Sequence, residues 1–153
     1  MGSYLNPGSK GFQESLNSEI YVDKTGLIEK TNAVLDTRQK FLCVSRPRRF
    51  GKSMAADMLA AYYERGEDAD LLFRSLKISK AESYRAHLNQ YDVIKVNIQE
   101  FLSMTGSMDE MLSMLKKYLV FDLMEHFDDV RFRDESNLIQ VMKDIYAKTK
   151  RAF

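Results

Sequence analysis

One segment in the first third of the chain constrains the fold more than any other. Four successive apolar residues, FLCV at 41–44, are bounded by polar residues and are followed by the loop SRPRRFGKS at 45–53. An apolar run of this length is typical of a strand that is buried on both faces of a parallel sheet. The next stretch, MAADMLAAYYERG at 54–66, is rich in strong helix formers and ends on a glycine. The segment therefore predicts a strand, a loop and a helix in succession.

The remaining sequence extends this pattern to an α/β fold. Residues 91–98 are rich in β-formers and predict a second strand, and a short β-favouring run covers 20–22. Strands that are separated by helices of ten or more residues favour parallel strands flanked by helices. We expect an irregular leader over 1–18, short helices within 67–90, and longer helices over 25–36, 54–66, 108–127 and 135–149.

The loop ends in three residues that suggest phosphate binding. Gly51, Lys52 and Ser53 match the last three fixed positions of the pattern G-x-x-x-x-G-K-[ST]. In such a loop, backbone N–H groups and the helix dipole attract phosphate oxygens, the lysine reaches the β- and γ-phosphates, and the serine hydroxyl ligates Mg²⁺. The first glycine is replaced by Arg46. The alternative is an ordinary loop end at which Lys52 and Ser53 only start a helix, although a lysine in the first turn opposes the dipole.

Three segments carry a resemblance to a known family. YVDKTGLI at 21–28, VSRPRRFGKSM at 44–54 and the AADMLAAYY that follows resemble the predicted AAA-ATPase-like family of bacterial and archaeal P-loop proteins. The resemblance extends over essentially the whole chain. In this family RPRRFGKS is a variant of the Walker A motif, and many members carry a C-terminal PD-(D/E)XK nuclease-like domain. The resemblance implies a partial P-loop NTPase fold that uses ATP and Mg²⁺.

Carried over by position, the resemblance assigns nucleotide binding to the loop. The arginines would shape or neutralise it, and Pro47 would stiffen it by fixing φ. For the arginines, a solvated basic turn or a site for another anion is the alternative. The 21–28 motif would lie near the nucleotide, at the adenine or against the loop, although a plain strand-to-helix junction is favoured for Asp23 and Lys24. The implied cofactor-binding residues are Arg46, Pro47, Arg48, Arg49, Phe50, Gly51, Lys52, Ser53 and Met54, with Ser53 as the metal ligand.

The sequence assigns no catalytic residue. ATP hydrolysis needs an acidic residue at the end of a second buried strand. Asp122 follows four apolar residues but lies inside an unbroken helical pattern, and Glu100 follows an interrupted apolar run. We therefore interpret residues 1–153 as the N-terminal part of an AAA-ATPase-like P-loop domain that stops before the Walker B strand. Such a chain would bind nucleotide without turning it over.

Composition narrows the functional classes that remain possible for the chain. The 23 basic and 22 acidic residues give a net charge of +1, which argues against a wholesale nucleic-acid or membrane-surface binder. Without an apolar run of about 18 residues no membrane span is expected. The lone Cys43, expected in the core, points to a reducing compartment, and we predict a cytoplasmic protein. The resemblance implies a bacterial source.

Two other functions remain open from the sequence. The first is a nucleic-acid or anion-binding module that uses the Arg46–Arg49 cluster, and the second is an interaction domain with a degenerate loop. The expected partner of the leading interpretation is a nucleotide. Nucleic acid, through an absent nuclease-like domain, and self-association are further candidates.

Overall fold

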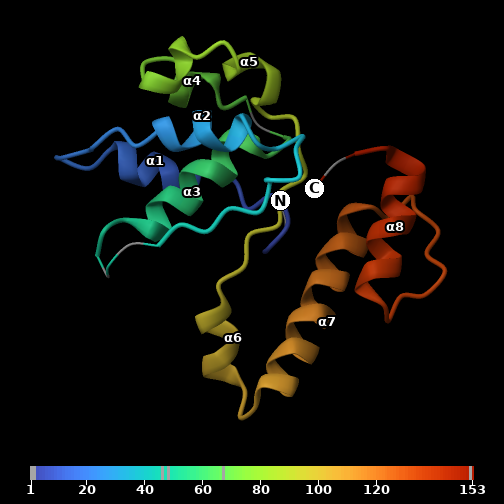
Figure 1. Cartoon of the computed structure of the whole chain (residues 1–153). Coiled ribbons are helices and arrows are strands. Elements are labelled where there is room, and N and C mark those ends of the chain that lie inside the picture. Colours follow the sequence, from blue (N-terminus) through green and yellow to red (C-terminus); the bar gives the residue numbers. More distant parts are fainter. Residues whose placement is uncertain (1–2, 46, 48, 67, 152) are drawn as a thin grey trace. The chain divides into compact units, whose positions relative to one another are not determined.

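The computed structural model describes residues 3–45, 47, 49–66, 68–151 and 153, and this part of the chain is helical (Figure 1). Among the described residues no regular strand forms, and the β-type pairings are two isolated bridges, Leu5 with Ile94 and Glu64 with Tyr91. The helical segments of the described chain are α1 (Lys10–Leu16), α2 (Gly26–Asn32), α3 (Lys52–Tyr63), α4 (Asp70–Phe73), the 3-10 helix η1 (Lys77–Lys80), α5 (Tyr84–His87), α6 (Ile98–Met104), α7 (Met108–His126) and α8 (Leu138–Thr149).

The predicted α/β fold of parallel strands flanked by helices is therefore wrong. Residues 41–44 pair with no strand in the described chain, and their side chains are exposed, Phe41 by 87%. An apolar run becomes a buried strand only where neighbouring strands bond its backbone and other elements cover both of its faces. Here the helices supply the core by themselves, so the run stays at the surface. Cys43, expected in the core, is exposed for the same reason.

Two further elements differ from the expectation, whereas the longer helices agree with it. The predicted strand over 91–98 is replaced by isolated bridges and by the start of α6, which the side chain of Asn97 caps by accepting a bond from the Gln99 N–H at 3.1 Å. The predicted irregular leader over 1–18 contains α1. The helices predicted over 25–36, 54–66, 108–127 and 135–149 are confirmed as α2, α3, α7 and α8, with somewhat different ends.

The described chain divides into two compact units, one of residues Gly8–Tyr91 and one of Met1–Pro7 with Asp92–Phe153. The 8–91 unit has an aromatic core. Phe12 of α1 stacks on Phe73 with ring centroids 4.8 Å apart, and Tyr62 of α3 meets Phe73 edge-on at 5.4 Å. Gly11 lets α1 approach α3 closely, because a Cβ at this position would lie 2.9 Å from Cγ of Asp57. This core fixes the helix whose N-terminus carries the predicted loop.

A buried polar network joins α2 to α3 and α5 within the same unit. The side-chain amide of Asn32 donates to the hydroxyl oxygens of Tyr62 and Ser83, both at 3.1 Å, and its carbonyl oxygen accepts from the Tyr63 hydroxyl at 2.6 Å. Tyr63 also bonds the Thr31 hydroxyl. A buried network of this kind is stabilising only while each member keeps its partner. Asn32 is thus the junction that holds α2 against α3.

Glu64, directly after α3, holds both ends of the 8–91 unit. Its carboxylate accepts a bond from the Gly8 N–H at 2.9 Å, and its backbone forms the parallel bridge to Tyr91. The Arg65 N–H donates to the Tyr91 carbonyl at 2.7 Å. Glu64 is only 4% exposed, so this arrangement is part of the interior. The point at which the chain enters the unit and the point at which it leaves therefore meet at one residue.

The second unit contains α6, α7 and α8 and has its own core, in which Leu123 of α7 and Ile145 of α8 are fully buried. Asp122 lies in the middle of α7, as the helical pattern predicted, and is 7% exposed. Its carboxylate accepts bonds from the N–H groups of Tyr4 at 2.6 Å and Leu5 at 3.3 Å. This acidic residue therefore anchors the N-terminal segment.

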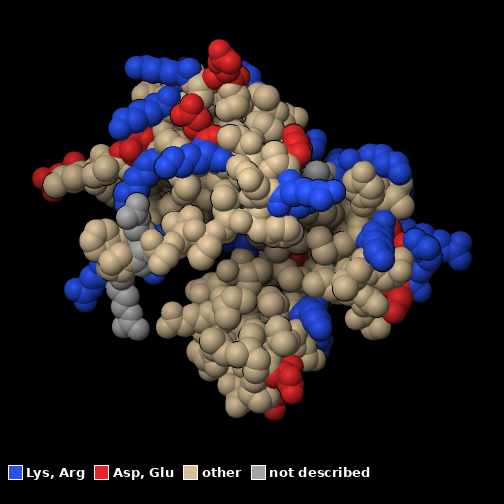
Figure 2. Space-filling view, viewed as in Figure 1, with Lys and Arg blue, Asp and Glu red and all other residues tan. Residues whose placement is uncertain are grey.

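Charged side chains of both signs are interspersed on the surface. On the face drawn in Figure 2, the described Lys and Arg side chains lie in separate groups with Asp and Glu between them. None of the helices in the described part of the chain combines the length and the apolar composition that a membrane crossing requires.

Candidate phosphate-loop site

The predicted loop enters α3 through two residues in the left-handed region. Arg49 has a φ of 67° and Gly51 a φ of 75°. Glycine adopts such angles without strain, whereas other residues seldom do. Gly51 is the N-cap of α3, and its carbonyl accepts the first helical bond from the Ala55 N–H at 2.9 Å. Gly51 has no side chain with which to cap the N–H groups of the first turn. A glycine at this position therefore leaves room for an external acceptor beside the start of α3.

The side chains of the first turn suit an anionic acceptor. Lys52, Ser53 and Met54 are exposed, and none of them is acidic. The positive end of the helix dipole and the N–H groups of the first turn both favour a negatively charged group here. The Lys52 ammonium adds a full positive charge. Ser53 contributes a hydroxyl oxygen, the type of donor that Mg²⁺ prefers.

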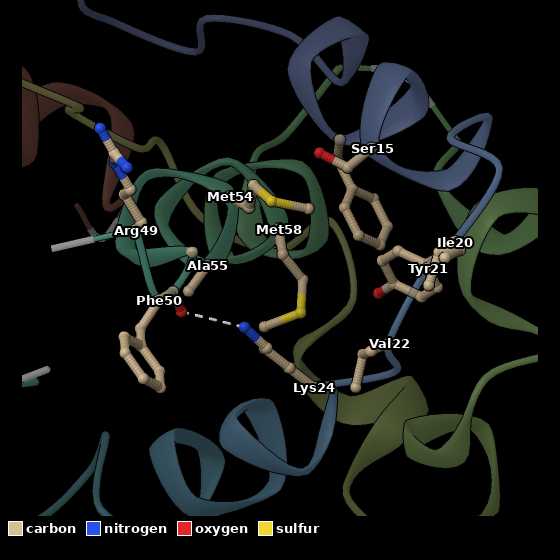
Figure 3. Close-up of a pocket in the computed structure, with 12 residues that line it drawn as sticks. Ser15, Ile20, Tyr21, Val22, Lys24, Arg49, Phe50, Met54, Ala55 and Met58 are labelled. Carbon is tan, nitrogen blue, oxygen red and sulfur yellow. Dashed lines mark hydrogen bonds between the residues drawn. The ribbon is translucent and has the colours of Figure 1, made fainter. Parts of the chain in front are cut away.

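Lys24 reaches the same loop from a distant part of the sequence. Its ammonium nitrogen donates a hydrogen bond to the Phe50 carbonyl oxygen at 3.0 Å, drawn as the dashed line in Figure 3. A Cβ at Gly51 would lie 2.8 Å from the Lys24 ammonium nitrogen. The sequence favoured a plain strand-to-helix junction for this residue, and the structure brings it against the loop instead. The absent side chain at Gly51 leaves the space that Lys24 occupies.

The residues on either side of Lys24 fix its position. Asp23 accepts bonds from the N–H of Thr25 at 2.9 Å and from its hydroxyl at 2.6 Å, and a second oxygen of Asp23 accepts from the Lys77 N–H at 2.8 Å. The hydroxyl of the fully buried Thr25 also accepts from the Ile78 N–H at 3.1 Å. The turn that carries Lys24 is thereby tied to η1. An Asp followed two positions later by Thr is a turn signal that could have indicated this order.

The pKa of Asp23 reflects these bonds. Burial of the carboxylate acts to raise its pKa, but the bonds from the Thr25 hydroxyl and from the N–H groups of Lys77 and Thr25 outweigh burial, so the pKa lies below its ordinary value. Asp23 is therefore ionised at neutral pH. The negative charge strengthens the hydrogen bonds that hold the turn. Asp23 directly precedes Lys24 in the sequence.

A cavity of about 480 Å³ lies on one side of Lys24. Three lysines line it, Lys24, Lys30 and Lys52, and no acidic residue is among the described residues of its wall. Gly51 and Phe50 form the part of the wall that belongs to the loop. The cavity therefore places three lysines beside the N-terminus of α3, within a wall that is otherwise mostly apolar. Their positive charge favours an anion there.

A second cavity, of about 300 Å³, lies beside the first, and the walls of both cavities are mostly apolar. Both cavities share Lys24, Phe50, Gly51 and Ala55. In Figure 3, Met54 and Met58 of α3 lie on one side of this second cavity, opposite Tyr21 and Val22, and Lys24 extends towards Phe50 of the loop. The two cavities thus meet at the residues of the predicted phosphate loop.

The other predicted site residues lie as follows. Arg46 and Arg48 fall outside the described residues. Pro47, Arg49 and Phe50 are exposed, and the Arg49 guanidinium points away from Tyr21 and Met58 in Figure 3. Glu100 and Asp122 belong to the other unit, in α6 and α7. Among the described residues, the site therefore brings together Lys24, Gly51, Lys52 and Ser53, and the apolar residues around Tyr21.

Comparisons with known proteins give one match. A family model described as "Predicted AAA-ATPase" matches residues 8–153. Searches of curated proteins and of solved structures find no match.

Proposed function

The chain belongs to the AAA-ATPase-like family, and from this premise we propose that it binds the phosphates of ATP, with Mg²⁺, at the N-terminus of α3. The observation that carries the proposal is the convergence of two lysines on the N-terminus of α3. Lys52 stands in the first turn of α3, and Lys24 contacts the loop that leads into it. Gly51 adopts the left-handed conformation between them.

The geometry favours a polyphosphate over a compact anion. One helix N-terminus and one lysine would suffice for a sulfate or a carboxylate. Here three lysines line a single cavity of about 480 Å³, and acidic side chains are absent from its described wall. A triphosphate carries several negative charges along an extended chain of oxygens. The charge of the cavity therefore suits a triphosphate better than a compact anion.

The residues present also fit a magnesium ion that accompanies the phosphates. Mg²⁺ keeps several waters and takes one or two oxygen ligands from the protein besides the phosphate oxygens. The exposed hydroxyl of Ser53, in the first turn of α3, is an oxygen of this kind. When bound, the ion would neutralise phosphate charge. Ser53 would hold it, while Lys24 and Lys52 would orient the phosphate oxygens.

The proposal is tested by titration calorimetry of the full chain with MgATP. We expect saturable binding that Lys52→Ala weakens by about tenfold or more, because a hydrogen bond to a charged group contributes about 1.5–3 kcal/mol. Lys10→Ala is a matched control, since Lys10 is also exposed and is also the first residue of a helix. Binding should leave this control unchanged.

Two results would contradict the proposal. One is a failure of MgATP to bind at all. The other is equal weakening by Lys10→Ala and Lys52→Ala, which would indicate attraction by overall charge. A titration with a short DNA duplex at rising salt separates the arginine-cluster alternative, because phosphodiester contacts weaken steeply with salt.

A further inference from the structure

The second unit carries a surface groove that has no part in the phosphate site. Helices α6 and α7 form a hairpin (Figure 1), and the groove, of about 350 Å³, lies where the end of α6 meets the first half of α7. We call it the Met104 groove, and it is lined by Met104, Thr105, Glu110, Ser113, Met114, Lys117 and Tyr118. Its wall thus combines apolar side chains with one acidic and one basic residue.

An exposed aromatic ring stands beside this groove on the same face of α7. Glu110, Met114, Lys117 and Phe121 follow one another at intervals of three or four residues, so they lie along one side of the helix. The first three line the groove, and the ring of Phe121 is 65% exposed. An aromatic ring gains free energy when it is removed from water. One helix face therefore presents both a ring and a groove that is able to receive one.

The charges on this face are complementary to the face itself. Glu110 lies in the first turn of α7, and Lys117 follows about two turns later. One carboxylate oxygen of Glu110 accepts a bond from the Gly106 N–H at 3.0 Å, and within the described part of the chain Lys117 forms no ion pair. If two such helices pack antiparallel, Glu110 of each faces Lys117 of the other. A parallel pair in register would bring like charges together instead.

We propose that a second copy of this chain covers the face, in a twofold-symmetric dimer whose two α7 helices pack antiparallel. The rise per residue of a helix sets the register. With Lys117 opposite Glu110 of the second copy, Phe121 extends four residues, about 6 Å, beyond that pair. On the second copy, the residue four positions before Glu110 is Gly106, in the turn that follows Met104. Phe121 of each copy therefore enters the Met104 groove of the other.

A second copy is favoured over an unrelated protein because this chain supplies every complement that the face requires. It provides an acid for Lys117, a base for Glu110 and a ring for the groove, and twofold symmetry uses each of them twice. The dimer does not depend on phosphate binding, since this face belongs to residues 92–153 and the phosphate loop belongs to the 8–91 unit.

The walls of the groove suit an aromatic ring. The ring of Tyr118 packs against those of Tyr4 and Phe101, with centroids 6.4 and 6.0 Å apart, and Phe101 is fully buried. This wall is therefore anchored in the interior of the unit. Met104 is 49% exposed, and a methionine adjusts its shape and makes favourable contacts with aromatic rings. Burial of Phe121 supplies most of the affinity, because surface ion pairs contribute little, and the charges set the antiparallel direction.

The first experiment measures the mass of the full chain by sedimentation velocity at rising concentration. We expect a reversible equilibrium between monomer and dimer. Phe121→Ser should raise the dissociation constant by at least about tenfold, because the buried ring is lost twice in each dimer. Ile139→Ser is the matched control, since Ile139 is also 65% exposed, belongs to α8 of the same unit and lies outside the groove. It should leave the equilibrium unchanged.

The second experiment exchanges charges, at low salt so that they are not screened. Lys117→Glu and Glu110→Lys should each weaken the dimer, because like charges then face each other. An equal mixture of the two variants should associate again, since each supplies the partner that the other lacks. Lys143→Glu controls for overall charge, because Lys143 is exposed on α8 outside the groove. Circular dichroism verifies that each variant keeps its helices.

Four results would overturn the proposal. A chain that stays monomeric up to about 1 mM has no such interface. A dimer that is equally stable in Phe121→Ser is held by another surface. A mass that keeps rising beyond that of a dimer contradicts the twofold symmetry, because an isologous interface closes at two copies. Failure of the mixed charge variants to associate, where the native chain does, contradicts the antiparallel pairing.

Discussion

The ammonium group of Lys24 donates a hydrogen bond to the carbonyl oxygen of Phe50, although the two residues lie 26 positions apart in the sequence. This bond joins the turn before α2 to the loop before α3. Asp23 and the buried Thr25 hold the turn against η1, so the backbone that carries the lysine is anchored. Lys24 therefore presents a positive charge beside Gly51. The following predictions test this arrangement and the structure around it.

Replacing Lys24 by methionine should weaken binding of both MgATP and tripolyphosphate. The change keeps the length of the side chain and removes its charge, so we expect a loss of about tenfold, typical of one charge-assisted hydrogen bond. Calorimetric titration measures the loss. Lys10→Met controls for the removal of one positive charge from the same unit. Unchanged phosphate affinity in Lys24→Met would show that the lysine only braces the loop.

Gly51→Ala should lower both stability and phosphate affinity. An alanine at a φ of 75° costs about 1–2 kcal/mol, and its Cβ would displace the Lys24 ammonium 2.8 Å away. Gly26→Ala is the matched control, because nothing lies within 4 Å of its added Cβ. It should be neutral or stabilising by up to about 1 kcal/mol. Urea unfolding measures both variants, and equal stabilities would contradict the conformational argument.

Asn32→Ala should be among the most destabilising polar substitutions in the 8–91 unit. It leaves the hydroxyl groups of Tyr62, Tyr63 and Ser83 without their shared partner. Loss of such buried bonds should lower the free energy of unfolding by about 2 kcal/mol. Asn17→Ala, at the exposed end of α1, should change it by less than about 0.5 kcal/mol. A similar loss in both variants would indicate that the network contributes little.

Acid should weaken the anchor of the Lys24 turn. The pKa of Asp23 is lower in the folded chain than in the unfolded one, so its carboxylate stabilises the fold above the unfolded pKa of about 3.9. That contribution is lost as the pH falls through the unfolded value towards the folded one. The difference in unfolding free energy between the native chain and Asp23→Asn should therefore be largest near neutral pH and shrink below about pH 4. Asp36→Asn, an exposed control, should track the native chain, and a difference for Asp23→Asn that is constant with pH would contradict this.

ATP should bind without being turned over by this chain. The described walls of both cavities contain no carboxylate that could hold Mg²⁺ or orient a water molecule. Release of inorganic phosphate should therefore stay at the rate of a protein-free blank. Steady release that disappears in Lys52→Ala would overturn this expectation.

The sequence predicted the long helices well, because local composition determines them. The apolar spacing within α7 and α8 and the strong helix formers of α3 were sufficient to predict these three helices. The sequence did not predict that residues 41–44 are exposed. An apolar run of four has the same local pattern whether other strands cover it or not, and only the tertiary structure decides between burial and exposure.

The candidate site was likewise predicted in part. Gly51, Lys52 and Ser53 follow from a contiguous motif, since their spacing along the chain sets their spacing in space. The position of Lys24 does not follow from such a motif, because its contact with Phe50 depends on how α2 and α3 pack. The second cavity depends in the same way on the close approach of α1 to α3 at Gly11.

Because Gly8 and Tyr91 both contact Glu64, the two ends of the 8–91 unit lie together. This has a consequence for how the segment can be exchanged between proteins. A segment whose entry and exit are adjacent can be cut out, or spliced into a surface loop of another protein, without stretching its ends. Residues 8–91 include the phosphate loop, the Lys24 turn and both cavities. They therefore form a unit whose two ends meet at Glu64, a geometry that suits insertion into another protein.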